Sequence, residues 1–270
     1  MFATRLATAV VLIAAFTAAL YGLPAGWWMA LLLPVLAVAS WEWSVLAGFG
    51  LLQRRAFTGI VLVSALLAGY VGASAAARHA PTIDLVVYAV SGAFWVLLAV
   101  PWLALGCRVK SRSVMGLTGW ILLVPTWLAL ARLQADPGQL LALLGIIWVS
   151  DTAAYLAGKA WGKHKLAPAI SPGKTWEGAA GAAVAVAVYY VALSVTIPEW
   201  SWWKGPGGVV LFAGVALAGV LGDLFESWIK RQAGAKDSGS LLPGHGGVLD
   251  RVDSMTAGLP IAALLLPYAR

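Results

Sequence analysis

The chain has 270 residues, of which 61% are hydrophobic and only 11% are charged. A soluble domain of this length needs a charged surface around its core, so the composition excludes an ordinary soluble protein and predicts an all-α, polytopic integral membrane protein. The formal net charge of +7 fits membrane topology and anionic lipid phosphates better than nucleic-acid binding, and the single cysteine, Cys107, excludes an intrachain disulfide framework.

Apolar runs of about 20 residues, the length that a helix needs to cross the hydrocarbon, predict about nine transmembrane helices. They are expected near residues 6–22, 27–48, 57–77, 84–105, 114–133, 138–157, 177–197, 208–228 and 255–269. A cleaved signal peptide is the alternative for the first run, but this run continues almost directly into the second, as a retained helical hairpin would. We predict a single membrane domain, 1–270, with N-terminal transmembrane helices in 1–135 and catalytic helices in 136–270.

Basic residues predict the orientation, because cytoplasmic loops are enriched in Lys and Arg. If the N-terminus is cytoplasmic, fourteen of the 18 basic residues fall on the cytoplasmic side. The other four are Arg78, Arg132, Lys204 and Arg270. Two long loops, 158–176 and 229–254, then face the cytoplasm, and we expect the chemistry to lie there.

The first loop lies in the segment SDTAAYLAGKAWGKHKLAPAISPGKTWEG, residues 150–178. Its phosphate-binding candidates are Lys159, Lys163, Lys165 and Lys174, although these lysines could equally serve only topology or contact lipid headgroups. Ser171 and Thr175 offer hydroxyls in a Pro-Gly turn before a helix, whose N-terminus is also available to a phosphate. The ending GKT is like that of a P-loop, but Pro168 stands where the motif requires its first glycine, so that interpretation is rejected.

The helix before the second loop places four polar side chains on one face. They are Asp223, Glu226, Ser227 and Lys230, at helical spacing. Two carboxylates, a hydroxyl and an ammonium can hold a divalent cation beside a phosphate. The alternative is a seam of salt bridges between helices.

The second loop contains KDSGSLLPGHGGVLDRVDS, residues 236–254. Asp250 and Asp253 lie one helical turn apart after a Gly-Gly corner, and both can point at one ion. With Asp223 they form an oxygen-only ligand set, which suits Mg²⁺. Gly246 and Gly247 can present backbone N–H groups to an anion. His245 has no second His or Cys nearby, so we interpret it as a phosphate contact or a local hydrogen bond rather than a zinc ligand.

Glu42 is an acidic residue inside the second predicted span. Such a residue marks either a functional site or a hydrogen bond to a neighbouring helix, and the sequence leaves both open. The role of Asp151, at the start of the first polar segment, is also open.

The stretch SWIKRQAGAKDSGSLLPGHGGVLDRVD, residues 227–253, resembles the signature of the bacterial phosphatidate cytidylyltransferases, also called CDP-diacylglycerol synthases. The segment 150–178 is also similar to that family. The resemblance implies a membrane enzyme that transfers CMP from CTP to phosphatidic acid and releases pyrophosphate. It further implies Mg²⁺, a second, monovalent cation such as K⁺, a homodimer, and a multi-pass location in the bacterial inner membrane with the active site facing the cytoplasm.

The resemblance also implies roles for single residues. Asp223, Asp250 and Asp253 would hold metal. The basic groups that would meet phosphates are Lys230, Arg231, Lys236 and Arg251, with Asp237 orienting them. Nucleotide contacts would come from Lys159, Lys163, Lys165, Ser171, Lys174, Thr175, His245, Gly246 and Gly247.

Two other functions remain open from the sequence. A CTP-dependent kinase of a polyprenol or another lipid would need the same helices, metal and basic residues, and it differs in which part of CTP enters the lipid. A transporter would explain charges inside the membrane, but it explains poorly why the acidic residues cluster on one side.

Overall fold

A computed structural model describes residues 13–77, 83–197, 203, 205–241 and 246–269. The described chain is almost entirely helical, which confirms the all-α class. Seven of the described helices are long and apolar enough to cross a membrane, and a shorter apolar helix, Ile13–Gly22, precedes them. Residues 6–12 of the first predicted span lie outside the described residues. The number of spans and the orientation stay predictions.

The long helices follow the predicted spans closely. They are α2, Ala25–Leu46; α3, Leu51–Ala77; α4, Ile83–Ala93, continuing into α5, Val100–Ala104; α6, Arg112–Leu133; α7, Pro137–Trp161; α8, Trp176–Thr196; α9, Pro206–Gln232; and α10, Leu249–Leu265. Between α4 and α5 the helix widens to a π-helical stretch, Phe94–Ala99. Pro101 lacks the N–H that an α-helical ladder needs, which accounts for the wider turn before it.

The two predicted loops are shorter than expected. The helices α7 and α9 continue to Trp161 and Gln232, and α10 begins already at Leu249. Hydropathy underestimates such ends, because the helices carry polar side chains beyond their apolar spans. The first loop also contains an antiparallel hairpin of β1, Lys165–Ala167, and β2, Ser171–Thr175, with Lys165 opposite Thr175. The sequence analysis did not predict these strands.

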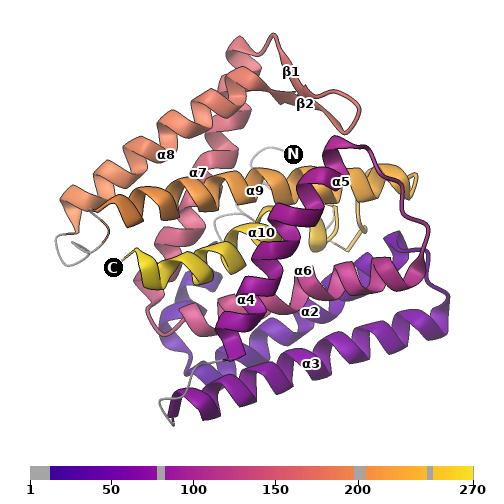
Figure 1. Ribbon diagram of the computed structural model, residues 1–270. Helices are drawn as coiled ribbons and strands as arrows, with labels where there is room; N and C mark the ends of the chain where they lie inside the picture. The colour runs from indigo at the N-terminus through magenta and orange to yellow at the C-terminus, as the bar shows by residue number, and fades with distance from the viewer. Residues whose placement is uncertain (1–12, 78–82, 198–202, 204, 242–245, 270) are drawn as a thin grey trace.

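Figure 1 shows two groups of helices on either side of α10. One group consists of α2, α3 and α6, which pack against one another; the other consists of α7, α8 and α9. The helix α10 packs against α9 and also against α6, α4 and α7. The hairpin extends from the end of α7 that leads into α8. Residues at the start of α10 can therefore meet side chains of both groups.

The fraction of buried residues distinguishes α6 from α3 and α8. Of the apolar span in α6, 67% is buried, against 17% in α3 and in α8. Along α8 the exposed side chains Val184, Val188, Val191 and Val195 follow a helical spacing. This apolar stripe is what a helix facing lipid requires.

Several tryptophans lie inside the bundle. The side chains of Trp28, Trp43 and Trp95 are almost fully buried. Each indole N–H donates a hydrogen bond to a backbone carbonyl of another helix: Trp28 to Leu130, Trp43 to Met115 and Trp95 to Thr256. These three tryptophans therefore join neighbouring helices through hydrogen bonds inside the bundle.

Candidate functional site

A cavity of about 480 Å³ lies where α7, the hairpin, α8, α9 and the start of α10 meet. Its polar lining consists of Asp151, Tyr155, Lys159, Ser171, Lys174, Thr175, Asp223, Asp250, Asp253 and Ser254. Its apolar lining includes Ala154, Leu166, Ala179 and Val220. The cavity thus joins both predicted polar segments, and it offers charged groups beside an apolar wall.

All three predicted metal ligands line this cavity. Asp223 comes from α9, and Asp250 and Asp253 come from the first turn and a half of α10. Asp151, on α7, lines the same cavity and accepts a hydrogen bond of 3.1 Å from the hydroxyl of Ser254. Three different helices therefore bring four carboxylates to one space.

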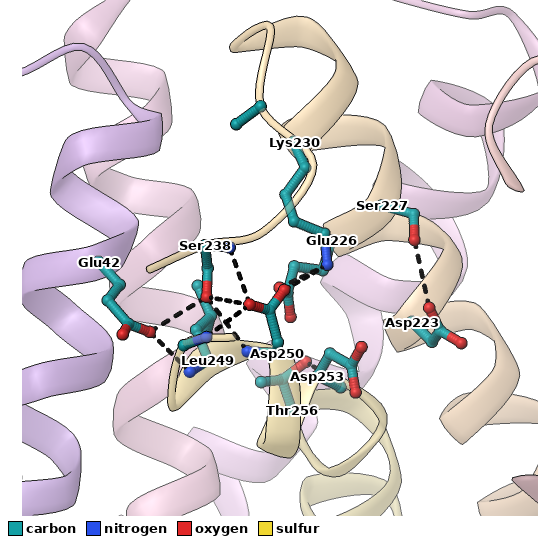
Figure 2. Close-up of polar contacts among 12 residues, drawn as sticks. Glu42, Asp223, Glu226, Ser227, Lys230, Ser238, Leu249, Asp250, Asp253 and Thr256 are labelled. Atoms are coloured by element: carbon teal, nitrogen blue, oxygen red, sulfur yellow. Dashed lines mark hydrogen bonds and ion pairs between the residues drawn. The ribbon is translucent and has the colours of Figure 1, made fainter. Parts of the chain in front are cut away.

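Asp250 is fixed in place by the described residues between α9 and α10, 233–241 and 246–248, which we call the two arms of the aspartate loop. Its Oδ2 accepts hydrogen bonds from the N–H of Ser238 at 2.8 Å, the hydroxyl of Ser238 at 2.9 Å and the N–H of Gly247 at 2.8 Å. Its Oδ1 accepts one from Lys230 Nζ at 2.6 Å (Figure 2). Burial raises the pKa of Asp250, but the bonds from Lys230 and from these two backbone N–H groups outweigh it and lower the pKa to about 2. Asp250 is therefore a carboxylate at neutral pH.

Lys230 lies between two buried carboxylates. Its Nζ is 3.1 Å from Glu226 Oε1, one helical turn earlier on α9, and 2.6 Å from Asp250 Oδ1. Glu226 is 2% exposed, and apart from this ion pair its carboxylate has no hydrogen-bond partner among the described residues. One ammonium thus serves two acidic groups, which ties α10 to α9.

The carboxylates suit a hard cation. Burial and the charge of Asp223 raise the pKa of Asp253, which precedes the last predicted span, to about 7; a nearby cation would reverse that shift. Asp250 Oδ1 accepts only one hydrogen bond among the described residues, so it has lone-pair capacity for a metal. No three His, Cys, Asp or Glu side chains of the described chain are arranged to hold a metal by themselves. Mg²⁺, which keeps waters and takes phosphate oxygens, fits such a partial set.

Two lysines also line the cavity, beside the carboxylates. Lys174, on β2, forms an ion pair with Asp223, with 2.8 Å between Nζ and Oδ2. Asp223 Oδ1 also accepts a hydrogen bond of 3.2 Å from Ser227, as Figure 2 shows. Lys159, on α7, lines the cavity with its Nζ over the ring of Tyr155. These two lysines are placed to meet an anionic substrate beside the carboxylates.

The base of the hairpin is a local hydrogen-bonded structure. Thr175 caps α8, since its hydroxyl accepts a hydrogen bond of 3.1 Å from the N–H of Gly178. Gly178 also lets α8 approach α7, because a side chain there would overlap the carbonyl of Ala154. Glu177 accepts hydrogen bonds from the N–H groups of Lys163 and His164 and contacts the His164 ring. The hairpin is thereby held at the mouth of the cavity.

Other predicted residues do not line the cavity. They are Lys163, Lys165, Lys230, Arg231, Lys236, Asp237, Arg251, Gly246 and Gly247. Gly246 has a φ of 81°, which only glycine adopts readily, and so forms the corner before Asp250. Predicted phosphate contacts of the basic residues stay predictions. His245 lies outside the described residues.

Sequence reasoning left four residues of this region without a role. Asp151 and Ser254 line the cavity, and Ser238 and Glu42 hold the aspartate loop. The acidic residues carried a signal, because carboxylates in apolar spans need partners. Ser238 and Ser254 gave no such signal, since a serine hydroxyl is tolerated almost anywhere in a helix or loop.

Comparison with known proteins identifies the family of the chain over almost its whole length. Residues 3–269 match the model of the cytidylyltransferase family. The phosphatidate cytidylyltransferase of Pseudomonas aeruginosa is 35% identical over 98% of this chain and 97% of its own length. That of Brucella suis is 42% identical over 63% of this chain and 64% of its own length, and that of Staphylococcus aureus is 46% identical over 45% and 46%. The chain therefore belongs to the cytidylyltransferase family.

Proposed function

We propose that this membrane protein transfers CMP from CTP to phosphatidic acid, giving CDP-diacylglycerol and pyrophosphate. The observation that carries the proposal is the cavity in which acidic, basic and apolar groups from both polar segments meet. The similarity to phosphatidate cytidylyltransferases over nearly the full length of one relative supports it. The apolar wall suits a lipid substrate, and the two lysines suit its phosphate and the triphosphate.

The reaction needs no nucleophilic side chain. An oxygen of the lipid phosphate attacks the α-phosphorus of CTP, the bond from that phosphorus to the bridging oxygen of the β-phosphate breaks, and pyrophosphate leaves. Two anions must approach each other, so the protein's task is to align them and to offset their charge. In this proposal Lys159 of α7 and Lys174 of β2, which both line the cavity, supply positive charge.

The carboxylates hold the metal in this proposal. Asp223, Asp250 and Asp253 would hold Mg²⁺, a cation that needs only one or two carboxylates from the protein when waters and phosphate oxygens are also available. When bound, Mg²⁺ supplies charge that offsets the phosphates. A second, monovalent cation such as K⁺ would find oxygen ligands in the same lining, which includes Asp151.

The proposal includes an orientation. With fourteen of 18 basic residues on the cytoplasmic side, the cavity opens toward the cytoplasm of a bacterial cell, where CTP is available. The protein then lies in the inner membrane, with lipid substrate arriving from the bilayer. A homodimer is part of the proposal through the family resemblance alone.

The test uses the purified chain in detergent with phosphatidic acid, Mg²⁺ and each of the four nucleoside triphosphates in turn. We expect CTP to give CDP-diacylglycerol and an equal amount of pyrophosphate, and ATP, GTP and UTP to give far less. Chelation of Mg²⁺ by EDTA should stop the reaction, and added Mg²⁺ should restore it. Equal turnover of all four nucleotides, or none with CTP, would contradict the proposal.

A further inference from the structure

A buried carboxylate of α2 contacts the aspartate loop from far away in the sequence. Glu42 is 5% exposed. Its Oε2 accepts a hydrogen bond from the N–H of Leu249 at 2.8 Å, and its Oε1 accepts one from the N–H of Val248 at 3.1 Å. The Ser238 hydroxyl, whose single proton is shared with Asp250 Oδ2, lies 3.1 Å from Oε2. Figure 2 shows Glu42 reaching from its helix toward Ser238 and Leu249. All these partners can donate, which suits an acceptor-only carboxylate.

Two of these donors belong to the N-terminus of α10. The first N–H groups of a helix have no partner within the helix and need a cap. Val248, at the N-cap position of α10, makes no side-chain capping bond. Glu42 supplies the missing acceptor from another helix, and a negative charge is favourable at this end of the helix dipole.

The backbone around Glu42 is shaped to admit it. Gly239 lies on the arm of the aspartate loop that follows α9, and Gly247 lies on the arm that precedes α10. A Cβ at either position would overlap the Glu42 carboxylate. Glycines at these two positions therefore let both arms close around one side chain. The fit shows that Glu42 is part of the loop's structure and not a neighbour by chance.

The same two arms orient Asp250. Its Oδ2 accepts hydrogen bonds from Ser238 and from the N–H of Gly247. Ser238 thus contacts both Glu42 and Asp250, and the first turn of α10, which carries Asp250, is capped by Glu42. Movement of Glu42 would shift Ser238 and Gly247, which hold Oδ2 of Asp250.

We propose that Glu42 is a positioning residue, which fixes both arms of the aspartate loop and thereby the orientation of Asp250 toward the cavity. The N-terminal helices then contribute to the site through α2, although none of their side chains lines the cavity. The effect on catalysis rests on the proposed function. The effect on the loop does not.

The variants Glu42→Gln and Glu42→Ala test the proposal. Gln keeps the volume but places an N–H₂ group where one carboxylate oxygen stood, so either the N–H of Val248, or the N–H of Leu249 together with the Ser238 hydroxyl, loses its acceptor. Ala removes both acceptors. Ser44→Ala is the matched control, because Ser44 is fully buried on the same helix and its hydroxyl donates to Trp41 O of that helix.

The first measurement is hydrogen exchange of the amides of Val248 and Leu249 by mass spectrometry of the purified protein. We expect exchange to become at least about tenfold faster for both amides in Glu42→Ala and for one of the two in Glu42→Gln, and to stay unchanged in Ser44→Ala. Unchanged exchange in a folded Glu42→Gln protein would overturn the proposal. This result does not depend on what reaction the protein catalyses.

The second measurement separates positioning from general destabilisation. Second-layer groups around a metal site typically alter metal affinity or activity by about 10–100-fold. We therefore expect Glu42→Gln to lower kcat and to raise the Mg²⁺ concentration at half-maximal activity by about tenfold. A variant that is only less stable would lose active molecules but keep the parent's Mg²⁺ dependence, and that result would overturn the proposal. If the parent protein itself is inactive, the proposed function is refuted. The hydrogen-exchange result then decides whether Glu42 fixes the aspartate loop.

Discussion

The hairpin and the aspartate loop border the same cavity but are held in different ways. The aspartate loop is fixed by buried groups of three helices: Glu42 of α2, Lys230 of α9 and Asp250 of α10. The hairpin base is fixed by partly exposed contacts: Glu177 accepts hydrogen bonds from the backbone N–H groups of Lys163 and His164 and contacts the His164 ring, whose side chain is 78% exposed. Buried polar contacts are costly to break and exposed ones contribute little. Substitutions of the buried groups that hold the aspartate loop should therefore affect folding and activity together, and those in the hairpin should leave folding largely unchanged.

The largest expected effect is that of Asp250→Asn. The variant keeps the shape of the side chain but loses its charge, and its amide N–H₂ must face Lys230 or the donors of Ser238 and Gly247. We expect the rate of CDP-diacylglycerol formation to fall by about 10³-fold or more, with the protein still eluting as a folded species in detergent. Full activity in this variant would remove Asp250 from the metal site.

Replacement of Lys230 by Met should have the largest effect on stability. It leaves Glu226 and Asp250 as buried carboxylates without their shared ammonium, a change that typically costs about 3–5 kcal/mol. We expect a clear drop in the unfolding temperature in detergent. Lys236→Met, an exposed position on the aspartate loop, serves as the stability control and should unfold like the parent. If both variants unfold alike, the loop is not held by buried charge.

A smaller effect is expected for Lys174→Ala, on the hairpin. Its ion pair with Asp223 is partly exposed, with side chains 23% and 29% accessible, so its loss should change stability by no more than about 1 kcal/mol. We expect the KM for CTP to rise by about tenfold, because a charge facing the phosphates is lost. Lys163→Ala, which does not line the cavity, should be milder. An equal effect of the two changes would mean that the lysines act only through the overall positive field.

The smallest effect is expected for His164→Ala. The Glu177 carboxylate keeps its hydrogen bonds from the backbone N–H groups of Lys163 and His164 in this variant. The rate of product formation should stay within about twofold of the parent, as for most exposed contacts. A tenfold loss of the rate would contradict this expectation, and a loss of folded protein in this variant would remove the contrast between the two regions.

Much of the fold was predictable, because apolar length alone marks a membrane helix. The spans of α2, α6 and α8 and the span formed by α4 and α5 were expected within about two residues of their observed bounds, whereas α3 and α10 begin earlier than expected, at Leu51 and Leu249 instead of near 57 and 255. The ends of α7 and α9 were not, since Lys159 and Lys230 lie on helical turns beyond the apolar spans. The hairpin was missed because its strands are short and contain Pro172 and Gly173, residues that normally argue against a strand.

The site was predictable where charge stood out against an apolar background. Asp223, Asp250, Asp253 and Lys174 were expected to meet, and all four line one cavity. The partner of Glu42 was not predictable, because it lies 196 residues away at Ser238 and its other donors are backbone N–H groups, which every residue except proline carries. A hydrogen bond to a backbone N–H cannot be predicted from the type of the residue that donates it.

The most direct test of the account follows the label of CTP into the lipid. The purified protein is incubated with phosphatidic acid, Mg²⁺ and CTP that carries radioactive phosphorus at either the α- or the γ-position. The account predicts that the α-label appears in the lipid and the γ-label in pyrophosphate. Transfer of the γ-label to the lipid, as a lipid kinase would produce, would contradict it.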